Sequence, residues 1–307
     1  MSEAKTALEI TMTQTNVFDF SATSVAQLAQ ADAARALAED IGAGDLTAAL
    51  VDPQRRAHAK ILAREAAVLC GAPWVEATVR QLDPTATCRW HVNEGQACAA
   101  EQVVLEIEGN ARALLSAERT ALNFLQLLSA VASRTALHVQ AVQGTNTKIV
   151  DTRKTLPGLR LAQKYAVRTG GGVNHRIGLF DAVLVKENHI AAAGGITAVM
   201  KKIAASADIT QRASFVEVEV ETLAELDEAL AAGADMLLLD NMPLPDLHEA
   251  VRRNSLRGDK RAVLEISGGV TLASLPALAQ TGVDRISVGA LTKDIKATDF
   301  SMRFQDL

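Results

Sequence analysis

The sequence predicts an α/β fold in two parts: a domain of mixed helices and strands, then a parallel sheet in the second half of the chain. Short apolar, β-branched runs recur from about residue 147 onward, with helical patterns between them. Each run also ends in a polar residue, as expected where ligands bind at the carboxyl ends of parallel strands. With 307 residues, 49% of them hydrophobic, the chain can form one large domain or two ordinary ones.

The composition argues against several classes of partner. The formal net charge of −5 does not suit a nucleic-acid-binding surface. The three cysteines lack the spacing of a zinc site or a disulfide framework and fit a reducing compartment: Cys70, Cys88 and Cys98. No signal-type apolar stretch opens the sequence, and no segment reaches the roughly 18 apolar residues of a membrane span. We therefore expect a cytoplasmic protein that acts on small molecules, without nucleic acid or membrane.

The first 113 residues predict an α+β domain. Helical patterns and strand-like pieces are mixed there with Gly and Pro: helices near 22–39, 45–50 and 73–82, strands near 58–71 and 102–109. In the stretch IGAGDLT, glycines form a turn and Asp45 caps the helix that follows. A long helix with one apolar face then runs from about Leu114 to Val142, and we expect it to link the two parts.

Six apolar runs predict the parallel sheet of the second half. Helical patterns separate them, for example where Leu223, Leu226 and Leu230 recur at helical spacing and Gly233 ends the helix. Six strands are too few for an eight-stranded barrel, so we expect a smaller or open one. The runs are 147–152, 182–188, 215–220, 236–241, 262–269 and 285–291.

Positive charge is concentrated in one segment of this acidic chain. Residues 151–176 carry six Lys or Arg and one His against a single Asp. Pro157 and Gly158 fit the central positions of a type II turn, so the residues before them leave the strand in a loop. Arg153 and Lys154 are therefore expected at a strand end rather than on a helix face.

Three consecutive glycines, 170–172, allow backbone conformations closed to other residues and deliver Asn174, His175 and Arg176 to a second loop. Arginine binds a planar carboxylate or a phosphate through two parallel hydrogen bonds. The sequence therefore predicts a pocket for a ligand with several negative charges. Its basic side chains are Arg153, Lys154, Arg176 and Lys186.

Other basic residues have simpler explanations. Arg160, Lys164 and Arg168 are spaced four apart, as on a solvated helix face. Arg119 falls in the first turn of the long helix if Ser116 caps that helix, and a positive charge there opposes the helix dipole. A broken local rule is a hint of function, although solvated arginines are common at helix starts.

Residues 215–220 alternate between valine and glutamate, so Glu217, Glu219 and Glu221 share one face of the strand. A parallel strand is normally apolar on both faces, and three glutamates are too costly for a dry core. We expect this face to line a wet barrel mouth that holds a cation. Asp240 ends the next strand, and carboxylates without Cys or His suggest Mg²⁺ shared with a phosphorylated substrate.

Two glycine-bearing turns follow late strands, in ISGG (266–269) and SVGAL (287–291). Backbone N–H groups exposed at such turns bind phosphate well. Paired on consecutive strands, they resemble the phosphate site that barrels build late in the chain.

On these residues the chain resembles quinolinate phosphoribosyltransferases. The resemblance runs from EDIGAGDLT (39–47) to SMRF (301–304) and is most specific through DTRKTLPGLRLAQKYAVRTGGGVNHRIGLFDAVLVKENHI (151–190). It implies an N-terminal α/β sandwich domain, residues 1–129, on which the tail 292–307 packs back. An open, incomplete α/β barrel at 130–291 would carry the active site. It also implies head-to-tail homodimers with active sites shared between subunits, and leaves higher oligomers open.

The resemblance implies an activity as well. Members make nicotinate mononucleotide, CO₂ and pyrophosphate from quinolinate and phosphoribosyl pyrophosphate with Mg²⁺, a step of de novo NAD biosynthesis.

The family's motifs also assign site residues. Those that bind quinolinate are Arg153, His175, Arg176 and Lys186, with Arg119 from the partner subunit, and Thr152 is a further substrate-binding residue. Lys154, Glu219 and Asp240 lie around phosphoribosyl pyrophosphate and its metal, and Glu219 and Asp240 bind Mg²⁺. These three and Lys186 are the catalytic residues. Phosphate loops hold Ser267, Gly268, Gly269, Ser287, Val288 and Gly289. Lys293 replaces a frequent His and keeps a positive charge for phosphate.

Three other functions compete with this one. A phosphoribosyltransferase for another acceptor, such as nicotinate, would not need the second basic clamp. A sensor that binds a phosphorylated ligand without turnover would gain nothing from Glu219. A barrel lyase would use Lys186 as a Schiff base. The type I phosphoribosyltransferase signature is absent from the sequence.

Overall fold

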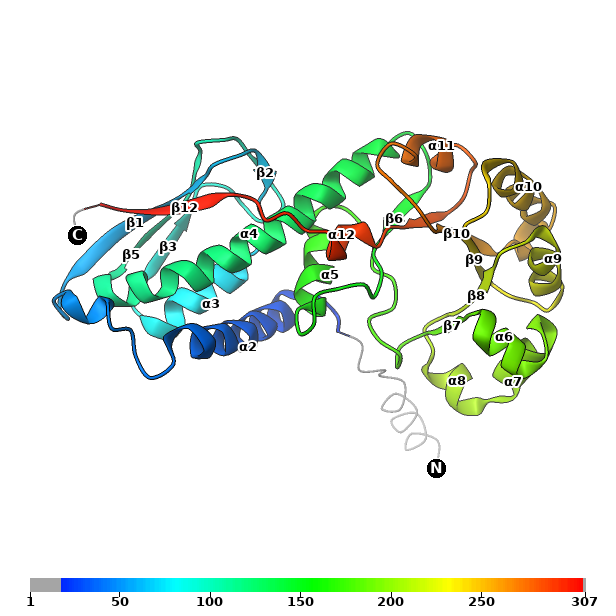
Figure 1. The fold of residues 1–307 in the computed structure, drawn as a ribbon, viewed down its shortest axis with the longest axis horizontal. Coiled ribbons are helices and arrows are strands. Elements are labelled where there is room, and N and C mark those ends of the chain that lie inside the picture. Colours follow the sequence, from blue (N-terminus) through cyan, green and yellow to red (C-terminus); the bar gives the residue numbers. More distant parts are fainter. Residues whose placement is uncertain (1–17, 306–307) are drawn as a thin grey trace, which may run out of the picture. The chain divides into compact units, whose positions relative to one another are not determined.

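A computed structural model describes residues 18–305 of the chain. Its contacts form two compact units, shown with their elements in Figure 1. The sandwich unit comprises residues 18–137, 154–172 and 290–305, and the barrel unit comprises 138–153 and 173–289. The division at residue 129 stays a prediction; the contacts group 154–172 with the sandwich unit. The expectation about a signal at the start of the chain falls outside the described residues.

A four-stranded sheet of order β12-β1-β5-β3 organises the sandwich unit, and helices α3 and α4 cover one face of it (Figure 1). In β1 (Arg56–Ala63) every second side chain is buried, which gives the sheet an apolar face. That face meets α4 in a core that includes Ile61, Leu105 and Leu114. The other elements of this unit are α2 (Ala22–Ile41), η1 (Ala48–Leu50), β2 (Ala67–Val68), α3 (Ala72–Leu82), β3 (Thr87–Trp90), β4 (Ala97–Cys98), β5 (Val103–Asn110), α5 (Arg160–Thr169), α12 (Ala290–Lys293) and β12 (Phe300–Gln305).

The long helix α4 spans Ala111–Ala141, so it begins before the predicted start. Ser116 therefore does not cap it; the Ser116 hydroxyl donates a 2.7 Å hydrogen bond to Asp45 Oδ2. Arg119 lies in the third turn and is exposed, so the argument from an unfavourable helix dipole is wrong. Although α4 has 31 residues, no helix in the described part of the chain is both long and apolar enough to cross a membrane.

The predicted turn before α5 is confirmed. The Leu159 N–H donates to the Leu156 carbonyl over 3.2 Å, and Gly158 has φ 79°, as the third position of a type II turn requires. The prediction that Lys164 lies on a solvated face of α5 is wrong: its side chain is fully buried and has interaction partners. Arg168 is exposed, as predicted. The spacing alone could not show that one turn of this helix faces inward.

The three glycines after α5 serve two purposes. Only Gly171 has a left-handed backbone, with φ 87°. At Gly170 and Gly172 there is instead no room for a side chain. A Cβ at position 170 would lie 2.4 Å from the Ala132 carbonyl oxygen, and a Cβ at position 172 would lie 2.8 Å from Thr135 Cγ2. The chain thus passes close to α4 on its way into the barrel unit.

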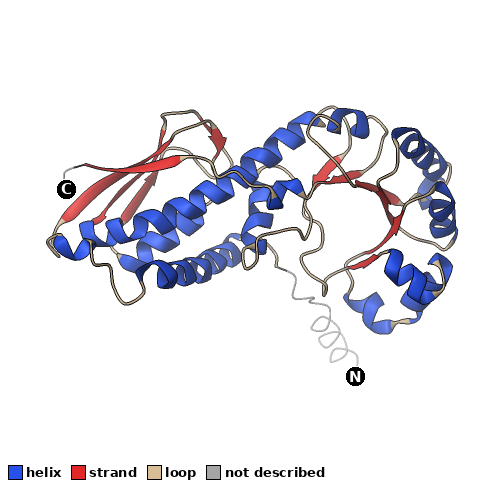
Figure 2. Cartoon of the chain, in the orientation of Figure 1, coloured by secondary structure: helices blue, strands red, loops and turns tan. Residues whose placement is uncertain are grey.

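The barrel unit is built on six parallel strands in the order β6-β11-β10-β9-β8-β7, with helices outside the curved sheet (Figures 1 and 2). No pairing closes β6 onto β7 among the described residues, so the predicted open α/β barrel is confirmed. Each predicted run contains one strand. The elements are β6 (Lys148–Val150), β7 (Val183–Val185), α6 (Glu187–Ala193), α7 (Ile196–Ala205), α8 (Ala207–Arg212), β8 (Val216–Val220), α9 (Leu223–Ala231), β9 (Met236–Asp240), α10 (Leu244–Ser255), η2 (Gly258–Lys260), β10 (Val263–Ser267), α11 (Leu275–Ala279) and β11 (Arg285–Ser287).

Candidate active site

The carboxyl ends of neighbouring strands bring the predicted acidic residues together. Glu219 is one residue from the end of β8, and Asp240 ends β9. In the pairing of the two strands Glu219 lies opposite Leu238, so the carboxylates sit on adjacent strands. Lys186, directly after β7, donates a 2.7 Å hydrogen bond from Nζ to Glu219 Oε2. Three of the predicted catalytic residues therefore share one edge of the sheet.

Opposing effects act on the pKa of the Glu219 carboxyl. Burial raises its pKa most strongly, the hydrogen bond from Lys186 lowers the pKa, and the negative charge of Asp240 raises it again. Two carboxylates that repel each other at a strand end form a place where a cation would lower the energy. Oxygen ligands of this kind fit Mg²⁺, which prefers hard donors.

Arg153 and Arg176 form a basic centre in the same unit. Partial burial lowers the pKa of Arg176, and the positive charge of Arg153 lowers that pKa further, so the two guanidinium groups lie near enough to repel each other. Arg176 Nη1 donates to the Ala182 carbonyl over 3.2 Å. The carboxylates of Asp181 and Glu217 raise the pKa of Arg176 again, and an anionic ligand would offset the repulsion further. The arrangement suits a carboxylate or phosphate held by two arginines.

Two buried carboxylates hold the loop that carries Arg176. Asp151 accepts hydrogen bonds from Asn174 Nδ2 at 2.6 Å and from the His175 N–H at 2.9 Å. Asp181 accepts from two consecutive backbone N–H groups at 2.8 Å each, those of Ile177 and Gly178. Sequence reasoning did not give Asp181 a role; an Asp next to a Gly-containing run was the available signal.

The interpretation of the glutamate face is wrong for Glu217. That side chain is 0% exposed rather than in a wet mouth, and Glu221 lies beyond the end of β8. Glu217 is buried beside His175, whose Nε2 lies 2.8 Å from Glu217 Oε2. Burial raises the pKa of Glu217 to about 7. The carboxyl is tolerated because polar and charged partners surround it, which alternation along one strand cannot reveal.

Buried Glu265 and half-buried Arg285 complete this cluster and were missed by the sequence reasoning. Arg285 Nε lies 2.7 Å from Glu265 Oε2, and Glu265 Oε1 lies 3.6 Å from His175 Nε2. Burial raises the pKa of Glu265 to about 7, with Glu217 adding to the effect. A glutamate inside the apolar strand β10 and an arginine at the start of β11 were the signals that could have identified the pair.

The glycine turn after β10 is shaped by a neighbour. Gly268 has φ 92°, and a Cβ atom there would lie 2.1 Å from Asn241 Oδ1. Asn241 itself has a left-handed backbone, with φ 53°, and its N–H donates to the Ser267 carbonyl over 3.0 Å. Ser267, Gly268 and Gly269 thus form a tight turn directly beside Asp240.

The turn after β11 has donors that are already used. The Val288 N–H donates to the Val150 carbonyl at 2.9 Å, and the Ser287 hydroxyl donates to the Ile266 carbonyl at 3.3 Å. Both residues are buried, and Gly289 follows them at the end of the barrel unit. Val288 and Ser287 therefore hold the turn against the sheet.

Three predicted site residues belong to the sandwich unit: Arg119, Lys154 and Lys293. All three are exposed. The Thr292 hydroxyl donates to the Lys154 carbonyl over 2.8 Å, so the segments that carry Lys154 and Lys293 lie side by side. Of the other predicted substrate-binding residues, Thr152 lies in the barrel unit beside Arg153 and is half-buried.

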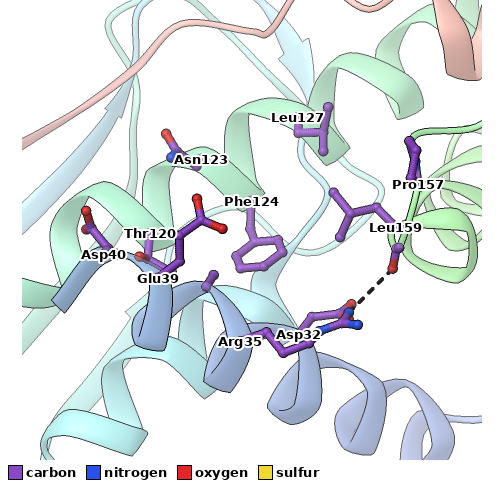
Figure 3. A pocket seen from close by; sticks show the side chains of 12 residues that line it. Asp32, Arg35, Glu39, Asp40, Thr120, Asn123, Phe124, Leu127, Pro157 and Leu159 are labelled. Atoms are coloured by element: carbon purple, nitrogen blue, oxygen red, sulfur yellow. Dashed lines mark hydrogen bonds and ion pairs between the residues drawn. The ribbon is translucent and has the colours of Figure 1, made fainter. Parts of the chain in front are cut away.

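A separate cavity of about 480 Å³ opens in the sandwich unit between α2, α4 and the turn at Pro157 (Figure 3). Apolar walls come from Phe124 and Leu127, and carboxylates from Glu39 and Asp40. Its Arg35 is already bonded to a buried aspartate, Asp32. None of the predicted site residues lines this cavity, and its acids do not suit an anionic ligand.

Two family descriptions match nearly the whole chain. Residues 45–129 match the N-terminal domain of quinolinate phosphoribosyl transferase, and residues 131–303 match its C-terminal domain.

The names of individual relatives agree with these family descriptions. The chain is 43% identical over 264 residues to a probable nicotinate-nucleotide pyrophosphorylase (carboxylating) of Bacillus subtilis, covering 86% of this chain and 89% of the relative. It is 38% identical to the mitochondrial quinolinate phosphoribosyltransferase (decarboxylating) 2a of Nicotiana tabacum, covering 87% and 80%. The solved nicotinate-nucleotide pyrophosphorylase of Francisella tularensis superposes with a TM-score of 0.84 at 45% identity, covering 91% of this chain and 97% of that one.

Proposed function

Because this chain belongs to the quinolinate phosphoribosyltransferase family, we propose that it transfers the phosphoribosyl group of phosphoribosyl pyrophosphate to quinolinate. The products would be nicotinate mononucleotide, CO₂ and pyrophosphate, in the formation of NAD. The observation that carries the proposal is the pair of arginines in the barrel unit: Arg153 follows β6, and Arg176, whose Nη1 donates to the Ala182 carbonyl, has its pKa lowered by the positive charge of Arg153.

Quinolinate carries two carboxylates on adjacent ring carbons, so it needs more than one cationic partner. Arg153 and Arg176 supply two charges in the barrel unit, and Lys186, which follows β7 and pairs with Glu219, supplies a third. Thr152 and His175 lie next to these arginines in the chain. An arginine clamp holds a planar carboxylate in a fixed orientation, which places the ring nitrogen for attack.

Glu219 and Asp240 favour positive charge at the ribose. When the bond from the anomeric carbon to pyrophosphate breaks, the sugar becomes oxocarbenium-like, and fixed carboxylates stabilise that charge. The same pair would hold Mg²⁺, which when bound neutralises charge on the pyrophosphate group. Lys154 and Lys293, side by side in the sandwich unit, would add positive charge for phosphate.

No general base is required for this reaction. The quinolinate nitrogen attacks with its own lone pair, and its alkylation makes the ring cationic. The carboxylate beside the nitrogen can then leave as CO₂, because the electrons it leaves behind are stabilised by the adjacent positive nitrogen. The site accordingly consists of clamps and carboxylates rather than a nucleophile with a base.

The tight turn at Ser267–Gly269 and the turn at Ser287–Gly289 would hold phosphate groups. In the second turn we assign phosphate binding to the Gly289 end, since the Val288 N–H is used by the sheet. The protein would act as a cytoplasmic homodimer in which Arg119 of one subunit reaches the site of the other.

Release of pyrophosphate that depends on quinolinate tests the proposal. Quinolinate should support turnover far better than nicotinate, because a site for two carboxylates leaves a cationic group unpaired when one is missing. Equal turnover of the two acids would assign the chain to another acceptor. Borohydride trapping of a Schiff base on Lys186 would instead favour a lyase.

A further inference from the structure

A line of hydrogen bonds runs from the barrel interior to the arginine clamp. The Arg176 backbone N–H donates to His175 Nδ1 over 2.8 Å, and His175 Nε2 lies 2.8 Å from Glu217 Oε2. Because Nδ1 accepts a hydrogen bond, the ring proton is on Nε2, which therefore donates to Glu217. Both ring nitrogens of His175 are engaged by the protein itself.

The His175 ring is fixed from several sides. Its side chain is 7% exposed, and its ring lies edge-on against Phe215 with centroids 5.3 Å apart. Its main-chain N–H donates to Asp151. Because the ring is held in this way, loss of the hydrogen bond at Nε2 would shift either the ring itself or Arg176, whose N–H is bonded to Nδ1.

A metal ion is the alternative explanation for this cluster. His175, Glu217 and Glu265 offer ligand atoms that all lie within 4.8 Å of one another. Arg285, however, lies 2.7 Å from Glu265 and already supplies a positive charge to the carboxylates. The cluster is thus a buried polar network with its own cation rather than a vacant ligand set.

We propose that Glu217 is a positioning residue for the acceptor: through the tautomer and orientation of His175 it fixes Arg176, without contacting substrate. This inference rests on the proposed function, in which Arg176 binds a carboxylate of quinolinate. Arg153 comes from another segment, directly after the end of β6. Loss of Glu217 should therefore affect Arg176, which is bonded to His175, more than Arg153.

Substitution of Glu217 gives the first test. Glu217→Leu leaves the Nε2 proton without an acceptor, so the KM for quinolinate should rise about tenfold. The KM for phosphoribosyl pyrophosphate should stay within about twofold, since the hydrogen bonds of His175 connect Glu217 to Arg176. Glu217→Gln keeps an acceptor oxygen and should restore most of the quinolinate affinity. An equal rise in both KM values, or a Gln variant as impaired as the Leu variant, would overturn the proposal.

A matched control separates positioning from general loss of stability. Glu94 is a half-buried carboxylate of the sandwich unit that accepts two backbone hydrogen bonds, from Gly71 and Ala72. Glu94→Leu should lower the melting temperature and leave the KM for quinolinate unchanged. If it raises that KM as much as Glu217→Leu does, the effect at Glu217 is only destabilisation.

A double-mutant cycle locates the residue through which Glu217 acts. Quinolinate affinity is measured calorimetrically, so that no turnover is needed. Adding Glu217→Leu to Arg176→Ala should weaken binding no further, whereas adding it to Arg153→Ala should multiply the two losses. Multiplied losses with both arginines would contradict the proposed link to Arg176.

Nitrogen-15 NMR of the histidine ring tests the geometry apart from the reaction. The wild-type protein should show a bare Nδ1 and a protonated Nε2 at His175. A doubly protonated ring, or a proton on Nδ1, would overturn the positioning role. If wild-type protein releases no pyrophosphate with quinolinate, the proposed function fails, and the NMR result still decides the state of the ring.

Discussion

Gly268 lies so close to Asn241 that a Cβ atom at position 268 would be 2.1 Å from the Asn241 side-chain oxygen. The residue also has φ 92°, which disfavours any side chain. Gly268→Ala should therefore distort the turn beside Asp240 and lower the affinity for phosphoribosyl pyrophosphate about tenfold or more.

A second substitution separates the two causes. Asn241→Ala in the Gly268→Ala background removes the clashing side chain and should recover part of the affinity, while the backbone strain remains. Gly269→Ala is the matched control, since its φ of 57° is also left-handed but nothing lies within 4 Å of the added Cβ. No recovery in the double variant would show that the clash is not the cause.

Metal removal tests the acidic centre. EDTA should abolish activity and Mg²⁺ should restore it. Asp240→Asn should lower kcat by about 10²-fold or more while quinolinate still binds, since the lost charge acts mainly in the transition state. Asp235→Asn, an exposed residue before the same strand, should have wild-type kcat. Full activity in EDTA would rule out a catalytic metal.

A mixed dimer tests whether active sites are shared between subunits. Arg119→Ala and Arg153→Ala should each be almost inactive, because each removes a carboxylate clamp. If the two variants are refolded together, half of the dimers are mixed and each has one intact site. About a quarter of wild-type activity should then return under two-fold symmetry. A mixture that stays inactive after verified subunit exchange would refute the shared site.

The buried Glu265 predicts a pH dependence of stability. Burial raises its folded-state pKa to about 7, above the unfolded value near 4.5. The neutral acid is favoured in the folded protein. Its contribution to the free energy of unfolding is therefore fully present below about pH 4.5 and is lost as pH rises to about 7. In the Glu265→Gln variant the melting temperature should depend less on pH across this range. An unchanged profile would show that Arg285 keeps the carboxylate ionised.

Much of this fold was predictable because it depends on local patterns. The six strands, the turn at Pro157–Gly158 and the open sheet all follow from apolar runs and turn residues that act over a few positions. The start of α4 was placed three residues late, since the strand β5 runs directly into the helix without a break in the sequence.

The interior of the barrel could not be predicted in the same way. The burial of Glu217 depends on His175, Glu265 and Arg285, which come from three separate stretches of sequence. Lys164 likewise looks solvated in its helical pattern and is buried by contacts made elsewhere. Charge pairs between distant segments leave no periodic signal, so they appear only when the strands are placed side by side.

The pairing of β12 with β1 has a consequence for how the protein is made. Residues 300–305 complete a sheet whose other strands lie before residue 111, and the register runs from His58 opposite Gln305 to Ala63 opposite Phe300. During translation the edge of β1 that pairs with β12 stays unpaired until the ribosome has synthesised the whole barrel unit. A chain halted before residue 300 would expose that edge to other nascent chains, so premature termination late in the message should yield aggregates rather than an enzyme with a shortened tail.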